Sequence, residues 1–206
     1  MKFIAISTFS ILSSCLLFSA NFLDNIPPAK YDDWKILNKG KISVFHTQYS
    51  NVSWGKATAI FPIEIEDLYS ALKNLENYNN IFDRIIESQV LDKEENIVFI
   101  RLDMPYFLAD RDYTVKYVED YSDSDITIQF YSVFHPDTPD NTGSVTLPRA
   151  SGEWKLKSIP GKGTSVSYTW NGELLGKFPK SQLHTAWKEQ GNEVLTWLYN
   201  YVKKNK

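Results

Sequence analysis

Apolar and polar positions recur with two different periods along the chain, and these periods predict its secondary structure. The apolar side chains of Ile65, Leu68, Leu72 and Leu75 lie at helical spacing, and acidic residues stand at the start of this stretch. Residues 65–76 are therefore predicted to form a short helix.

On both sides of this helix, β-prone runs are separated by polar turn residues. The predicted strands are a hairpin over 34–49 that turns around Gly40, and then 52–61, 85–91, 96–104, 113–119, 125–134, 151–159 and 164–174. Because most of the turns are short, successive strands are expected to pair in an antiparallel meander.

The last part of the chain returns to the helical period. Residues 179–206 are predicted to form one long helix, with Pro179 in its first turn. Its apolar stripe consists of Leu183, Ala186 or Trp187, Gln190 or Gly191, Val194, Leu198 and Val202. Gly191 interrupts this stripe, and two explanations stand: close packing of the helix against the sheet, or room for a ligand.

The loop at 135–149 is too long for a hairpin turn and carries three prolines. Connections of this length in a compact domain commonly serve as lids or mobile functional loops. We expect the same of this one.

The first twenty residues differ from the rest of the chain. A basic start is followed by an uncharged apolar stretch, which is typical of a secretory signal. Leu12-Ser13-Ser14-Cys15 resembles a bacterial lipobox, in which the cysteine is lipidated, but apolar residues continue after Cys15. The alternative is cleavage near Ala20. Both interpretations predict export to the periplasm or cell envelope, with a signal at 1–20, a lead-in at 21–39 and the folded domain at 40–205.

Composition and motifs reduce the number of function classes that the sequence supports. The net charge of −3 gives no strong field for nucleic acid, and the aromatic content of 15% exceeds what a plain core requires. Cys15 is the only cysteine, so the mature domain has no disulfide and no thiolate metal cluster. The histidines are scattered, and no catalytic or phosphate-binding motif is present. The sequence therefore predicts a protein that is not an enzyme and holds no metal or cofactor.

Three segments resemble the signature segments of START domains, the lipid-transfer branch of the helix-grip fold. MPYFLADRDY (104–113) resembles P-x-x-x-x-x-R-D-aromatic, GEWKL with the following residues (152–168) resembles G-x-W-x-L-x-x-x-P-x-x-x-G-T, and GKFPK (176–180) resembles the approach to the terminal helix. The resemblance implies an α+β helix-grip fold, in which a curved antiparallel sheet wraps around a long C-terminal helix. A shorter helix near 65–76 completes this fold, which encloses a hydrophobic cavity.

The resemblance also implies a function. A START-like domain binds one lipid or sterol-like molecule and carries it between membranes, so we expect a monomer that contacts membrane surfaces transiently. Loop 135–149 corresponds to the cover of the cavity mouth, with His135, Pro139, Leu147 and Arg149 as its lid residues. The alternative is a cyclase- or dehydratase-like enzyme of the same fold that uses polar cavity groups.

Alternation along the strands and the helical stripe indicate which side chains face the interior. The residues expected to line the cavity are Arg111, Asp112, Tyr113, Tyr117, Trp154, Tyr168, Trp170, Leu183, Trp187 and Gly191. Each aromatic residue taken alone fits a solid core equally well. The combination of a long loop, an interior glycine and an ionic group favours a cavity.

The orientation of Arg111 matters because an unpaired buried charge is strongly unfavourable. If Arg111 points inward, Asp110, Asp112 or another acid must accompany it, and the pair could orient a ligand head group. The alternative is an exposed turn in which Asp110 caps the strand. The START resemblance favours the inward pair.

Overall fold

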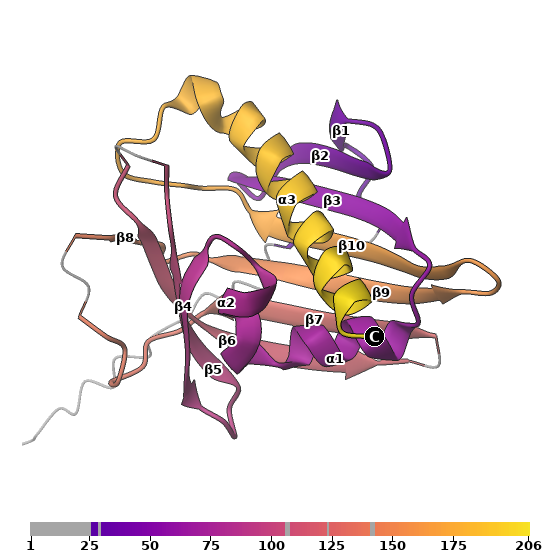
Figure 1. Cartoon of the computed structure of the whole chain (residues 1–206). Helices are drawn as coiled ribbons and strands as arrows, with labels where there is room; N and C mark the ends of the chain where they lie inside the picture. The colour runs from indigo at the N-terminus through magenta and orange to yellow at the C-terminus, as the bar shows by residue number, and fades with distance from the viewer. Residues whose placement is uncertain (1–25, 29, 106–107, 123, 141–142) are drawn as a thin grey trace, which may run out of the picture.

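The computed structural model of the chain describes residues 26–206 except 29, 106–107, 123 and 141–142 (Figure 1). The predicted signal segment and Cys15 therefore lie outside the described residues, and their processing stays a prediction.

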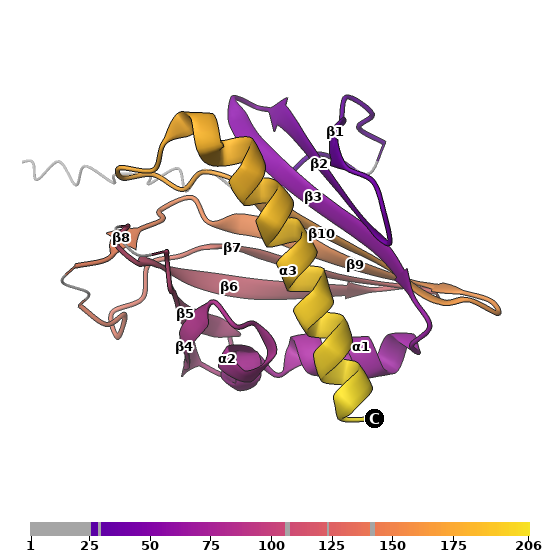
Figure 2. The same cartoon turned by 45° about the horizontal axis from the view of Figure 1, so that its top comes forward.

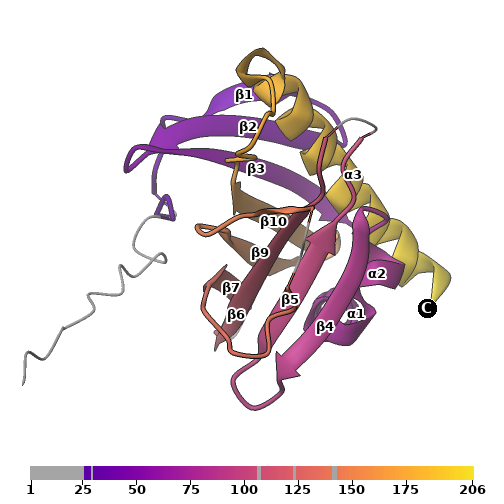
Figure 3. The same cartoon turned by 90° about the vertical axis from the view of Figure 1, so that its left-hand side faces the viewer.

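Ten strands in the described part of the chain form one sheet, in the order β1-β2-β3-β10-β9-β7-β6-β5-β4, with β8 paired to β6. The strands are β1 (Lys35–Asn38), β2 (Ile42–Tyr49), β3 (Val52–Phe61), β4 (Ile85–Asp92), β5 (Ile97–Leu102), β6 (Arg111–Tyr121), β7 (Asp125–Ser132), β8 (Val145–Thr146), β9 (Ser151–Ile159) and β10 (Gly163–Asn171). All neighbours are antiparallel except β6 and β8, as the short turns predict. The sheet bends around the terminal helix (Figure 3).

The helices lie on the concave side of this sheet. They are α1 (Ile65–Lys73), α2 (Tyr78–Ile81) and α3 (Leu183–Lys204), with 3-10 turns at Leu75–Asn77 and Lys180–Gln182. α3 runs across the concave face (Figure 2). The predicted helix-grip architecture is thus confirmed, although α3 begins after a 3-10 turn and not at Pro179.

α3 packs directly on β2 and β3 through small residues. A Cβ atom on Gly191 would lie 3.0 Å from both methyl groups of Val44 and 3.1 Å from the Cβ of Ala57. Leu195 and Leu198 continue the same buried face of the helix. Close packing, and not room for a ligand, therefore explains this glycine.

The described part of the segment predicted as a lead-in, which begins at residue 26 and omits 29, belongs to the fold. Its residues 35–38 form the edge strand β1, and Ile26 packs with Val52 and Trp54 of β3 in a second, smaller core. Trp34 also lies under the ammonium group of Lys56, 3.9 Å from the ring centre. Among the described helices, none is long and apolar enough to cross a membrane.

Candidate functional site

A cavity of about 380 Å³ lies between the concave face of the sheet and α3. This volume is within the range of small-molecule sites. The strands supply an aromatic floor, α3 supplies the opposite wall, and described residues of the loops at 103–110 (except 106–107) and 172–179 close one end.

The floor consists of side chains from four neighbouring strands. Tyr113 and Tyr117 of β6, Phe130 of β7, Trp154 of β9 and Tyr168 of β10 all line the cavity. Alternation along each strand directs these residues to the concave face. Trp154 and Tyr168 stack with ring centres 4.3 Å apart, which gives the floor a flat, rigid surface.

The tyrosines of this floor are neutral. Burial raises the pKa of Tyr113, Tyr117 and Tyr168 above the usual value. The hydroxyl groups of Tyr113 and Tyr168 make no hydrogen bond with any described residue, although both side chains face the cavity. They are therefore polar groups inside an apolar hollow that a ligand could satisfy.

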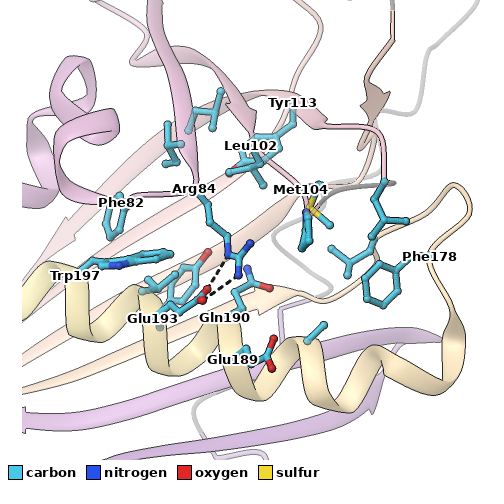
Figure 4. A pocket seen from close by; sticks show the side chains of 18 of the residues that line it. Phe82, Arg84, Leu102, Met104, Tyr113, Phe178, Glu189, Gln190, Glu193 and Trp197 are labelled. Carbon is cyan, nitrogen blue, oxygen red and sulfur yellow. Dashed lines mark hydrogen bonds and ion pairs between the residues drawn. The ribbon is translucent and has the colours of Figure 1, made fainter.

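A charged cluster interrupts the apolar wall opposite the floor (Figure 4). Arg84 donates two hydrogen bonds to Glu193 of α3, from Nε at 2.7 Å and from Nη2 at 2.9 Å. The pKa of Arg84 is raised, first by these hydrogen bonds; burial opposes the shift, while the charges of Glu193, Glu189 and Asp103 add to it. Glu189 and Gln190 line the cavity beside the pair.

Sequence reasoning missed this cluster. Glu189 and Glu193 lie four residues apart on the helix, next to Gln190 and Val194 of the predicted inward stripe. A pair of acids at this spacing beside an apolar stripe was the available signal. Nothing local marks Arg84 as the partner, because it is separated from Glu193 by 109 positions.

The mouth of the cavity is marked by the lining residues that solvent reaches. Pro105, Pro179, Gln182, Thr185 and Glu189 line the cavity and are exposed. The mouth therefore lies between loops 103–110 and 172–179 and the N-terminal half of α3. Met104 and Phe178 reach toward it from the two loops (Figure 4).

Arg111 is buried, with 1% of its surface exposed, but it does not line the cavity. Its guanidinium donates from Nε to the carbonyl oxygen of Leu174 at 2.7 Å, from Nη2 to that of Leu175 at 3.1 Å, and from Nη1 to that of Ala109. The expected carboxylate partner is thus replaced by backbone carbonyls. Burial lowers the pKa of Arg111 and the nearby charge of Asp110 raises it, but a guanidinium stays charged.

Arg111 therefore holds together the two loops that close the cavity. Leu175 and Gly176 both have left-handed backbones, with φ of 47° and 60°, and this turn presents consecutive carbonyl groups to the guanidinium. Contrary to the expectation of a head-group ligand, the arginine is a positioning residue for the mouth.

Asp112 points to the opposite face of β6. Its carboxylate accepts hydrogen bonds from the hydroxyl groups of Ser144 and Thr146, the latter at 2.8 Å. Backbone pairing of β8 with β6 reinforces this contact. Asp112 does not line the cavity; it fixes the long loop against the sheet.

The described part of loop 135–149, which omits residues 141–142, does not form the mouth as expected. His135 and Pro139 line neither cavity, and Thr138 bonds the outward hydroxyl of Thr114 at 2.9 Å. Leu147 and Arg149 instead line a smaller hollow of about 50 Å³ next to the main cavity. The ties to the outward side chains of β6 explain why much of the loop lies away from the mouth.

Of the other residues predicted to line the cavity, some do so and some do not. Trp170 lines only the smaller hollow, and Leu183 packs against the core without lining either space. Trp187 is buried, and its Nε1 donates to the carbonyl oxygen of Gly172 at 2.8 Å, which anchors the start of loop 172–179. Tyr113, Tyr117, Trp154 and Tyr168 do line the main cavity, and their contact with a ligand stays a prediction.

Within the described residues, no group of three or more histidine, cysteine, aspartate or glutamate side chains is placed to hold a metal ion. The described lining of the cavity presents an apolar aromatic surface, neutral hydroxyl groups and one charged cluster.

Comparison with known proteins gives structural but not sequence matches. No protein-family model matches the chain, and no curated protein matches it by sequence. The STAR-related lipid transfer protein from Xanthomonas axonopodis matches with a TM-score of 0.72 at 19% identity, over 84% of this chain and 99% of that chain. Human STARD10 matches with a TM-score of 0.73 at 18% identity, over 83% of this chain and 73% of that chain.

A third similar structure belongs to an enzyme. The Zhui aromatase/cyclase from Streptomyces sp. R1128 matches with a TM-score of 0.52 at 14% identity, over 73% of this chain and 93% of that chain. At these identities the likenesses establish the fold alone: the chain has the fold of START-related lipid-transfer proteins, which the cyclase shares.

Proposed function

We propose that this protein binds a single lipid or similar hydrophobic molecule in the cavity and carries it within the cell envelope. The observation that carries the proposal is the cavity itself, a partly enclosed space of about 380 Å³ with an aromatic floor. Solid packing at this place would have left no room for a ligand. The lipid-transfer proteins of the same fold support the choice by analogy.

Binding is driven by burial of the apolar part of the ligand. Each buried methylene group contributes about 0.8 kcal/mol, so a chain inside the cavity binds without a specific head-group contact. The aromatic floor provides the surface, and the wall of α3 covers the chain.

The ligand passes through the mouth between loops 103–110 and 172–179. Arg111 ties both loops through backbone carbonyls, so admission of a ligand requires these contacts to loosen or the loops to move together. Leu175 and Lys177 are exposed on the second loop, and Lys180 is exposed directly after it, which suits transient contact with a membrane surface. We propose that the protein acts as a monomer during this contact.

Location in the envelope rests on the N-terminal sequence. The basic start and apolar stretch support export, and Cys15 supports a lipid anchor as the alternative to cleavage near Ala20. Mass analysis of the mature N-terminus distinguishes the two routes. A full-length N-terminus beginning at Met1 would contradict both.

Transfer between vesicles tests the proposed function. Donor vesicles carry a self-quenched fluorescent lipid, and acceptor vesicles carry none. We expect the protein to accelerate dequenching in a concentration-dependent way, and Val194→Trp, which places a large side chain at a cavity-lining position, to remove the acceleration. If the protein turns over an added aromatic polyketide and transfers no lipid, the cyclase-like alternative replaces the proposal.

A further inference from the structure

The charges around the cavity do not favour all amphiphilic ligands equally. Arg84 is the only cationic side chain among the described residues that line the main cavity, and Glu193 engages two of its nitrogen atoms. Glu189 lines the cavity nearby and makes no hydrogen bond or ion pair with a described residue. The charge of Asp103 also acts on Arg84. One guanidinium is therefore paired with the carboxylate of Glu193 and lies within the electrostatic influence of those of Glu189 and Asp103.

This balance disfavours an anionic ligand at either end of the cavity. At the mouth, an acid would meet the carboxylate of Glu189, which the single cation among the described lining residues does not neutralise because Arg84 is paired with Glu193. Deeper in, the described aromatic floor offers it neutral tyrosine hydroxyl groups but no cation, and a buried charge without a counter-ion is strongly unfavourable.

The same groups suit a neutral or cationic ligand. The hydroxyl groups of Tyr113 and Tyr168 face the cavity without a partner among the described residues, so each can donate to or accept from a hydroxyl or carbonyl group. The carboxylate of Glu189 and the amide of Gln190 offer acceptors near the mouth, where an ammonium or hydroxyl group would lie.

We infer that the cavity selects amphiphiles with a neutral or cationic hydrogen-bond-donating head group, and discriminates against fatty acids and other anionic lipids. The inference rests on the proposed function and adds the chemical class of the ligand. Glu189 and Glu193 determine this specificity. Glu189 contributes a negative charge, and Glu193 occupies two donor nitrogen atoms of Arg84, which an anionic ligand would otherwise bind.

The size of the cavity sets the length of a suitable probe. A space of about 380 Å³ holds roughly a dozen atoms, at about 30 Å³ for each water-sized group. A dodecyl chain therefore matches it. Dodecylamine, dodecanol and dodecanoic acid share this chain and are cationic, neutral and anionic at pH 7.

Binding of these compounds, at submicellar concentration and low ionic strength, tests the inference. Trp154 and Trp197 line the cavity, so quenching of tryptophan fluorescence reports occupancy, and native mass spectrometry gives the stoichiometry. We expect dodecylamine to bind tightest and dodecanoate weakest, with at least about a fivefold ratio between them, as for one exposed charge interaction. The ratio should shrink in high salt.

Three variants sharpen the test. Glu189→Gln should weaken dodecylamine and strengthen dodecanoate while leaving dodecanol unchanged. Glu193→Gln releases the guanidinium of Arg84 and should strengthen dodecanoate several-fold. The control Glu66→Gln removes the same charge from an exposed position on α1, which does not line the cavity, and should change none of the three affinities.

The outcomes separate the inference from the proposed function. Dodecanoate that binds as tightly as dodecylamine, or a Glu193→Gln variant with unchanged affinity for dodecanoate, would overturn the inference alone. If none of the three compounds binds and no lipid is transferred, the proposed function fails and the inference fails with it.

Discussion

The two faces of α3 meet the same sheet in opposite ways. Over β2 and β3 the helix presents Gly191, and Val44 and Ala57 fill the contact so closely that even a methyl group would crowd them. Over β6 to β10 the adjacent face presents Gln190, Val194 and Trp197, and a cavity separates them from the aromatic floor.

The difference shows how one helix can close a core and also roof a cavity. Small residues let the helix backbone approach β2 and β3, and this solid side fixes its position. The curvature of the sheet then carries the remaining strands away from the helix (Figure 3). Stability and ligand binding should therefore depend on different faces of α3.

The largest effect on stability should follow a change on the face of α3 that packs closely on β2 and β3. Gly191→Leu places a side chain where a Cβ atom alone would already lie 3.0 Å from Val44. We expect the free energy of unfolding to fall by about 3 kcal/mol, since overpacking a close-packed core forces the helix to shift. Chemical denaturation measures it. A variant as stable as the wild type would contradict the close packing of this face.

The next effect concerns the arginine that ties the mouth. Arg111→Met removes hydrogen bonds to the carbonyl groups of Ala109, Leu174 and Leu175, and we expect a loss of about 2 kcal/mol in the free energy of unfolding. Because the guanidinium closes the mouth and does not touch the cavity, ligand exchange should become faster. Stopped-flow displacement of a bound probe measures the rate. A weaker equilibrium affinity with an unchanged exchange rate would instead place Arg111 in contact with the ligand.

A change on the face of α3 that lines the cavity should alter ligand binding without a large change in stability. Val194→Trp fills space inside the cavity, so the ligand affinity should fall at least about tenfold while the free energy of unfolding changes by less than about 1 kcal/mol. Titration with a dodecyl probe and denaturation of the same sample measure both. A large loss of stability with binding retained would reverse the assignment of the two faces.

The smallest expected effect is the pH dependence of the free energy of unfolding, which arises where α3 packs against β2. His46 of β2 lies beside His184 of α3, with ring centres 4.3 Å apart, and the ring of Trp187 is 5.8 Å away. The pKa of His46 is lowered by burial first, and then by His184 and Lys35. The unfolded chain, with a pKa near 6.5, therefore takes up a proton before the folded chain does.

The sign of the pH effect follows from this order. Above pH 6.5 His46 is neutral in both states, and as the pH falls through the lowered pKa the free energy of unfolding should decrease. The decrease should be smaller in His46→Gln. Thermal melts of both proteins between pH 7.5 and 5 compare them. Equal slopes would show that His46 does not contribute.

The fold could be predicted from the sequence because its signals are local. Alternation marks the strands, and the stripe through Leu198 and Val202 marks the terminal helix. The same alternation directs Tyr113 and Tyr168 toward the concave face. One glycine, Gly191, had two explanations in sequence, and only the position of Val44 decides between them.

The polar part of the site could not be predicted in this way. The guanidinium of Arg111 donates to backbone carbonyl groups, which every residue type carries, so the sequence does not mark these partners and the expectation of an acidic partner was wrong. Arg84 lies directly before β4 and Glu193 lies on α3, 109 positions later in the sequence, and the two side chains pair in the fold (Figure 4). Contacts of this kind depend on the tertiary fold.

Native mass spectrometry of the mature protein, purified without added ligand from the cells that naturally produce it, tests whether the cavity holds a ligand. We expect one hydrophobic molecule per chain in the wild type, and none in Val194→Trp prepared in the same way. Wild-type protein of bare chain mass that binds no dodecyl compound on titration would contradict this expectation.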